Sequence, residues 1–167
     1  VDVVGGKAAS LAELNTIPGI KVPEAFVVTT SLYDQILKQN PEIRERVKAL
    51  DEMSSAWLKA KLVGNNEEAE VWDGQVTATG KMIKEIMEKV SLPGLTENEI
   101  INNYDELCRK VGEENMAVAV RSSGISEDSK DNSFAGQYDT YLHRQGKEEV
   151  IESIKNCLAS QYTHRAI

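Results

Sequence analysis

Residues 118–140, VAVRSSGISEDSKDNSFAGQYDT, decide the fold and organise the rest of the chain. The stretch opens with a short alternation of β-branched residues, which predicts a strand that ends on Arg121. Ser122 and Ser123 follow at once, so the strand delivers its guanidinium into a loop of small residues. The planar fork of arginine matches the oxygens of a phosphate. We therefore interpret this strand end as half of a phosphate site; an ion pair with the acidic residues 127–128 is the alternative role for the arginine.

A polar loop and a second short segment complete the stretch. Residues 126–133 are polar and acidic, and FAGQYDT follows at residues 134–140. Gly136 has no side chain, so the backbone there can turn tightly or pass close to a ligand. Thr140 is a common strand residue. Both are candidates for a hairpin beside the phosphate site, with an ordinary turn and an ordinary strand position as the alternatives.

A glycine pair near the start of the chain predicts the other half of the site. Residues 3–11, VVGGKAASL, join a short apolar run to a helix-like segment with Leu11 and Leu14 on one face. A helix N-terminus attracts anions through its N–H groups and its dipole. Lys7 adds a mobile charge at that end. The Walker A pattern is absent, and an ordinary loop-to-helix junction is the alternative interpretation.

The middle of the chain, residues 31–112, predicts a block of helices with helical spacing of apolar residues. Breaks are expected at glycine, proline and asparagine positions: 40–41, 64–66 and 92–94. Ser31 and Thr96 each stand three residues before an acidic side chain, which predicts capping boxes. Gly112 is the expected terminator of the last helix in the block.

Two further elements complete the order. Residues 22–30, VPEAFVVTT, predict a strand, and a final helix is expected from Lys147 to about Arg165. The residues of that helix expected to face inward are Val150, Ile151, Ile154, Leu158 and Tyr162. The resulting order is helix, strand, helical block, strand, acidic loop, hairpin and helix. It predicts an α+β (α/β) fold with a mixed sheet.

Composition and charge narrow the possible functions. The 167 residues suffice for one substantial core. The formal net charge of -8 argues against a nucleic-acid surface, which needs a basic stripe. No apolar run approaches the ~20 residues that span a bilayer, and no signal peptide is visible, so we expect a cytoplasmic chain. Cys108 and Cys157 lack metal-site spacing and are expected to be reduced.

The ordered series of motifs resembles the N-terminal ATP-binding domain shared by phosphoenolpyruvate synthase, pyruvate phosphate dikinase and rifampicin phosphotransferase. The segments that carry the resemblance are residues 4–14, 22–30, 120–123 and 133–140. Residues 150–167 are also similar to the helix that follows the hairpin in this family, so the resemblance extends over residues 1–167. It implies the first subdomain of an ATP-grasp fold, with a mixed sheet and an inserted helical block at about 31–112.

The resemblance also implies roles for single residues. Lys7 and Arg121 fall where the family has its ATP-phosphate-binding lysine and arginine. Gly136 and Thr140 fall in the hairpin that covers the nucleotide. The sequence departs from the family at residues 124–128, GISED, where members often read Ala-Thr-Ala-Glu-Asp.

Neither histidine of the chain matches the phosphorylated carrier of the family. His143 stands where many relatives carry asparagine, and His164 lies beside an arginine near a helix end. The hairpin resembles the synthase and rifampicin branches more than typical pyruvate phosphate dikinases, whose hairpin is rich in methionine and glycine.

By resemblance, the function is the ATP-binding part of a dikinase-type phosphotransferase. ATP with Mg²⁺ would phosphorylate a histidine carrier, which would then phosphorylate pyruvate. The metal ligands, the second ATP-grasp subdomain, the phosphohistidine domain and the acceptor domain are expected after Ile167, so the 167 residues alone are expected to have no turnover. Rifampicin phosphotransferase, a stand-alone nucleotide-binding module and a plain acidic scaffold are the alternatives. The oligomeric state is left open.

Overall fold

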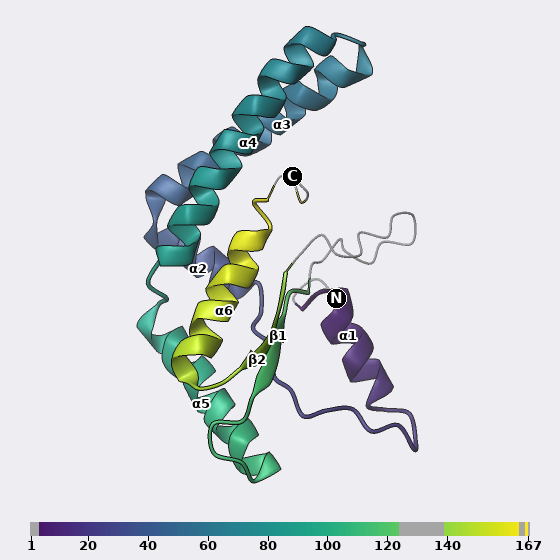
Figure 1. The fold of residues 1–167 in the computed structure, drawn as a ribbon, viewed down its shortest axis with the longest axis vertical. Coiled ribbons are helices and arrows are strands. Elements are labelled where there is room, and N and C mark those ends of the chain that lie inside the picture. The colour runs from purple at the N-terminus through teal and green to yellow at the C-terminus, as the bar shows by residue number, and fades with distance from the viewer. Residues whose placement is uncertain (1–3, 124–138, 164–165, 167) are drawn as a thin grey trace.

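The computed structural model describes residues 4–123, 139–163 and 166. Its elements follow the chain in this order (Figure 1): α1 (Gly5–Leu14), α2 (Ser31–Gln39), α3 (Pro41–Leu62), α4 (Asn66–Lys89), α5 (Gly94–Val111), β1 (Val118–Arg121), β2 (Thr140–Arg144) and α6 (Lys147–Ser160). The described part is therefore rich in helix with one small sheet, which agrees with the predicted α+β class.

Helices α3 and α4 form a long hairpin that projects from the rest of the molecule (Figure 1). Pro41 occupies the first turn of α3, where a missing N–H costs nothing. Asn65 begins α4 by accepting a hydrogen bond from the Glu68 amide at 3.3 Å. Both breaks fall where proline, glycine and asparagine predicted them.

The core lies where α4 meets α6 and where α2 and α5 pack beside them. Its largest fully buried apolar side chains are Leu32, Ile36, Ile43, Ile83, Met87 and Tyr104. Tyr104 also joins three segments, because its hydroxyl donates to the Met116 carbonyl at 2.8 Å and accepts from the Gly146 amide at 3.0 Å. This side chain therefore links α5 to the residues that precede β1 and α6.

The described sheet is a single antiparallel pair, β1 with β2, in place of the predicted mixed sheet. Val120 lies opposite Tyr141, and Arg121 lies opposite Thr140. An irregularity between Val118 and Val120 shifts the register toward the start of β1. Helix α6 packs against both strands and thereby supports the end of β1.

The prediction of a strand at residues 22–30 was wrong. Residues 21–29 have no regular secondary structure. Phe26 and Val28 are half-buried against the core, whereas Val27 between them is 46% exposed. The apolar residues of this extended segment are therefore alternately half-buried and exposed. Such a pattern does not require a strand that is paired in a sheet.

Helix boundaries explain the other differences. Ser31 and Thr96 do not cap, because α2 is preceded by Thr30 and α5 by Pro93, and neither helix has a side-chain cap. Gly112 terminates α5 with a left-handed φ of 81°, as predicted. Helix α6 ends at Ser160, short of the predicted Arg165. Its predicted inner face is confirmed, with Val150, Ile154 and Tyr162 buried and Ile151 and Leu158 packed beside them.

In the part of the chain that the structure describes, no helix is long and apolar enough to cross a membrane.

Candidate functional site

The N-terminus of α1 contacts the residues that directly follow β1. The Lys7 ammonium donates to the Ser122 carbonyl at 3.3 Å, and the Ala8 amide donates to Ser123 Oγ at 3.2 Å. Each contact joins residues that are 115 positions apart in the sequence. The glycine-pair segment and the strand that ends on Arg121 are thus neighbours in space, although the roles predicted for them remain predictions.

Gly5 allows this close approach. It is buried and has a φ of +71°, a conformation that side chains rarely adopt. A Cβ at this position would lie 2.0 Å from the Ser123 carbonyl oxygen and 2.6 Å from Ser123 Oγ. Both the backbone angle and the space available therefore require glycine here.

Arg121 and Thr140 lie directly opposite each other at the end of the sheet. Both are exposed, whereas the preceding and following residues, Val120 and Tyr141, are half-buried. Successive side chains of a strand point to opposite faces, so Arg121 and Thr140 share the open face. Two of the predicted binding residues thus line the same accessible surface.

The opposite face of the strand ends holds a thiol. Cys157 of α6 lies with its sulfur 3.9 Å from the Val120 carbonyl and 3.8 Å from the Asp139 carbonyl. Burial, followed by the charge of the Asp139 carboxylate, raises the pKa of this thiol to about 12, although the Lys7 ammonium opposes the rise. Cys157 therefore stays protonated at neutral pH, and a protonated thiol is a poor nucleophile.

Further polar groups border this site. The Asp139 carboxylate accepts from the Tyr141 hydroxyl at 3.2 Å, and the Asp139 amide donates to Ser160 Oγ at 3.5 Å. Burial, followed by the charge of Asp139, raises the pKa of Tyr141 to about 12. Ser122 Oγ is buried and has no hydrogen-bond partner among the described atoms. Asp139, Ser123 and Cys157 were not singled out from the sequence, because their contacts depend on the fold.

Some of the residues singled out from the sequence lie outside the described part of the chain. Gly136 and residues 127–128 lie outside the described residues, and so does His164. His143 is exposed and has a positive φ of 54°. Within residues 4–123, 139–163 and 166, no group of three or more His, Cys, Asp or Glu side chains is arranged to hold a metal ion.

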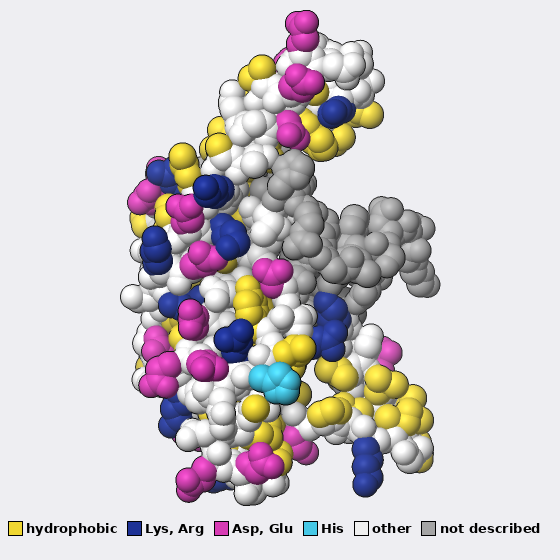
Figure 2. All heavy atoms as spheres, viewed as in Figure 1, with side chains coloured by type: hydrophobic (Ala, Val, Ile, Leu, Met, Phe, Trp, Pro, Cys, Tyr) yellow, Lys and Arg dark blue, Asp and Glu magenta, His cyan; other side chains and the backbone are white. Residues whose placement is uncertain are grey.

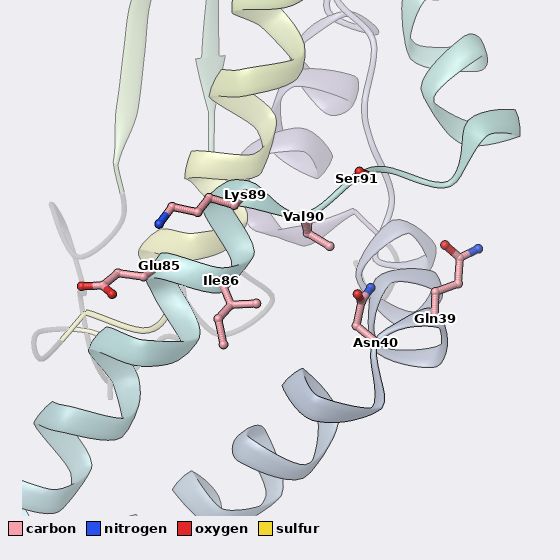
Figure 3. A pocket seen from close by; sticks show the side chains of 7 residues that line it. All are labelled: Gln39, Asn40, Glu85, Ile86, Lys89, Val90 and Ser91. Carbon is pink, nitrogen blue, oxygen red and sulfur yellow. The ribbon is translucent and has the colours of Figure 1, made fainter.

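A separate pocket of about 550 Å³ lies between α2 and the C-terminal turns of α4 (Figure 3). Figure 3 shows its labelled side chains spread around an open gap and coming from the ends of both helices and from the residues that follow them. They are Gln39, Asn40, Glu85, Ile86, Lys89, Val90 and Ser91. Neither α1 nor β1 contributes to this pocket, so it is distinct from the site at the end of the sheet.

Helix α1 and the segment after it carry an exposed apolar surface. Gly5 is the only buried residue of α1. Large apolar side chains from this part of the chain are between 40% and 47% exposed: Leu11, Leu14, Ile17, Ile20 and Val27. Figure 2 shows hydrophobic side chains gathered at the lower right, where Figure 1 has α1 and the following segment. The predicted apolar face of α1 therefore exists but does not point into the core.

Comparison with known proteins places this geometry in context. The family model described as "Pyruvate phosphate dikinase, AMP/ATP-binding domain" matches residues 1–167. A probable phosphoenolpyruvate synthase of Methanocaldococcus jannaschii is 38% identical over 170 residues. The phosphoenolpyruvate synthase of Helicobacter pylori is 36% identical over 170 residues, and the rifampicin phosphotransferase of Bacillus cereus is 37% identical over 165 residues.

The matches cover this chain almost completely and the relatives only in small part. All of the chain aligns with the two synthases and 99% of it with the rifampicin phosphotransferase. The chain spans 13%, 19% and 17% of the lengths of these three relatives, respectively.

Proposed function

The chain belongs to the family of the pyruvate phosphate dikinase AMP/ATP-binding domain, and we propose that it forms the phosphate-holding half of the ATP site in a dikinase-type phosphotransferase. Its fold would be the first subdomain of an ATP-grasp domain. The observation that carries the proposal is the 3.3 Å contact from Lys7 to Ser122, because it brings a cation to the loop that begins after Arg121.

The two cations would act in different ways. Lys7 supplies a compact and mobile charge at the N-terminus of α1, where the helix dipole also favours an anion. Arg121 supplies a planar fork on the open face, beside the Thr140 hydroxyl. Phosphoryl transfer depends mainly on positioning and on neutralising charge, and both of these tasks suit the two side chains. The hairpin containing Gly136 would cover the nucleotide and exclude water.

Mg²⁺ would accompany ATP in such a reaction and would neutralise charge on the nucleotide phosphates. The described residues do not offer a set of carboxylates that fits this ion. We propose that the protein ligands of the metal lie beyond Ile167.

For the longer protein that would contain this chain, we propose the activity of a phosphoenolpyruvate synthase. ATP would transfer its β-phosphoryl group to a histidine of another domain, the γ-phosphoryl group would pass to water, and the phosphohistidine would phosphorylate pyruvate. Synthases among the relatives support this choice. The 167 residues would bind ATP without turning it over, because the carrier and acceptor domains are not part of them.

A rifampicin phosphotransferase is the second candidate. Its support is the Bacillus cereus relative, which is about as similar to the chain as the synthases are. The two candidates would share the same phosphate-holding half and would differ in the acceptor. A stand-alone nucleotide-binding module is the third candidate and predicts ATP binding without any acceptor.

Calorimetric titration of the chain with ATP and magnesium tests the proposal. Lys7→Ala and Arg121→Ala are each expected to weaken binding by about tenfold, the factor that corresponds to ~1.4 kcal/mol for a charge-assisted contact. Lys48→Ala and Arg109→Ala are the matched controls, since both side chains are exposed on other helices. Binding that is unaffected by the first pair, or equally weakened by the controls, would contradict the proposed site.

Assays of AMP formation by the longer protein distinguish the candidate activities. AMP formation from ATP that depends on pyruvate favours the synthase. Dependence on rifampicin favours the antibiotic phosphotransferase, and binding without AMP formation favours the module.

A further inference from the structure

We infer that Ser123 is a positioning residue: its hydroxyl completes the first turn of α1 and thereby holds Lys7 at the phosphate site. The identity of the ligand, a phosphate of ATP, rests on the proposed function. The contact between Ser123 and α1 is given by the geometry of the described residues. Ser123 would act through Lys7 and would not touch the nucleotide.

Helix α1 has no cap of its own. The residue before its first turn is Val4, whose side chain has no oxygen to accept a hydrogen bond, and no side-chain cap is formed there. A helix start leaves several backbone amides in need of acceptors, and serine is among the preferred residues that supply one. In the first turn of α1, Ser123 Oγ accepts from the Ala8 amide at 3.2 Å and therefore supplies a side-chain acceptor from a distant part of the chain.

Apolar packing contributes little to the position of α1, so polar contacts hold its N-terminal end in place. Gly5 is the only buried residue of α1, while Leu11 and Leu14 are 41% and 40% exposed. Lys7 is also tethered to the strand end by its own long side chain, which donates to the Ser122 carbonyl. A flexible side chain fixes the helix backbone poorly, whereas the bond from Ala8 to Ser123 fixes the residue next to Lys7.

The absence of a side chain at Gly5 leaves room for the contact between Ala8 and Ser123. Gly5 presents no Cβ to Ser123, and a Cβ there would lie 2.6 Å from the Ser123 hydroxyl. The Ala8 contact and this close approach involve one serine and the same helical turn. Removal of the hydroxyl is therefore expected to loosen the turn that carries Lys7 without removing any charge from the site.

Ser123→Ala tests the inference, with Ser10→Ala as the matched control on the exposed side of the same helix. The first measurement is amide hydrogen exchange, which reports local opening and needs no ligand. The Ala8 amide is expected to exchange about fivefold faster in Ser123→Ala, because it loses this hydrogen-bond acceptor, and at an unchanged rate in Ser10→Ala. An unchanged rate at Ala8 in Ser123→Ala would overturn the inference.

The second measurement is a double-mutant cycle on ATP binding in the presence of magnesium. Ser123→Ala is expected to weaken binding by about fivefold in the unchanged chain and to have no effect in the Lys7→Ala background, because a residue that acts through Lys7 has nothing left to position. Additive losses would show that Ser123 acts independently of Lys7 and would overturn the positioning role.

The two measurements separate the two proposals. Failure of the chain to bind ATP would overturn the proposed function, and with it the role of Ser123 toward phosphate, while the exchange rate at Ala8 would still report the contact. Binding that depends on Lys7 but not on Ser123 would overturn the positioning role alone.

Discussion

Lys7 and Ser122, which are 115 residues apart, are joined by a hydrogen bond of 3.3 Å from the lysine ammonium to the serine carbonyl. This bond and its neighbour from Ala8 to Ser123 link α1 to the end of β1. The helix therefore depends on a few polar contacts, whereas α4 and α6 are held by extensive apolar burial. The site and the core are expected to respond differently to substitution.

Gly5→Ala is expected to disturb α1 specifically. The new methyl group would lie 2.0 Å from the Ser123 carbonyl oxygen, and the left-handed φ adds strain. We expect faster exchange of the first-turn amides and a loss of ~1–3 kcal/mol in the free energy of unfolding. The measurement is urea unfolding together with hydrogen exchange.

Gly74→Ala is the matched control for this substitution. Gly74 lies inside α4, and a Cβ there would meet no atom within 4 Å. Alanine favours a helix interior, so the free energy of unfolding is expected to rise by ~0.5–1 kcal/mol. Opposite signs for the two variants support the geometry at Gly5; a gain in stability in both would contradict it.

Tyr104→Phe is expected to destabilise the centre of the fold. The side chain is 1% exposed, and its hydroxyl serves both the Met116 carbonyl and the Gly146 amide. Its loss would leave both backbone groups without this partner, at a cost of ~1–3 kcal/mol. Thermal or urea unfolding measures it. Tyr141→Phe removes a hydroxyl with one carboxylate partner, so a smaller loss is expected there, and an equal or larger one would count against this account.

Ile83→Ala is expected to cost ~2–5 kcal/mol of unfolding free energy, because the side chain is fully buried in the core and its removal leaves a cavity. Leu62→Ala at the tip of α3 is the control. That leucine is 77% exposed, and its replacement is expected to change the stability by less than about 0.5 kcal/mol. Similar values for the two variants in urea titrations would be incompatible with the assigned core.

Stability is expected to fall in alkaline solution. The pKa of Cys157 rises from an ordinary 9.0 to about 12, and that of Tyr141 from 10.0 to about 12. Burial raises the pKa of Tyr33, Tyr104 and Tyr162 in the same direction. Between pH 9 and about 12 the unfolded chain therefore loses protons that the folded chain keeps, so the free energy of unfolding declines as pH rises.

Urea unfolding at a series of pH values measures this decline. Cys157→Ala is the control, because it should remove the part of the decline that begins near pH 9 and leave the part due to tyrosines. A free energy of unfolding that stays constant from pH 9 to 11 would contradict the assigned burial of these groups.

The local part of the fold was predictable from the sequence. Pro41 and Gly112 act within one turn of the chain, and the inner face of α6 follows from the 3.6-residue period of its apolar side chains. The strand at residues 22–30 was predicted wrongly because alternating burial does not require a hydrogen-bonded partner. The caps at Ser31 and Thr96 failed because the helices begin slightly earlier than the cap pattern indicated.

Single residues of the candidate site could be proposed from the sequence, whereas the contacts among distant segments could not. The order of the motifs indicated that Lys7 and Arg121 belong to one function. No pattern in the sequence indicates that Ser123 meets Ala8, or that Cys157 lies beneath the strand ends, because these contacts join distant segments. Leu11 and Leu14 illustrate the same limit: their helical spacing was right, but spacing alone does not say what the face contacts.

The contact between Ala8 and Ser123 also has a consequence for the order of folding. A nascent chain emerges from the ribosome with its N-terminal end first, and contacts between distant residues form slowly. The first turn of α1 is made before its acceptor, which is synthesised 115 residues later. The contact that links this helical turn to the end of β1 can therefore form only after both segments have been made, so it is completed late in folding.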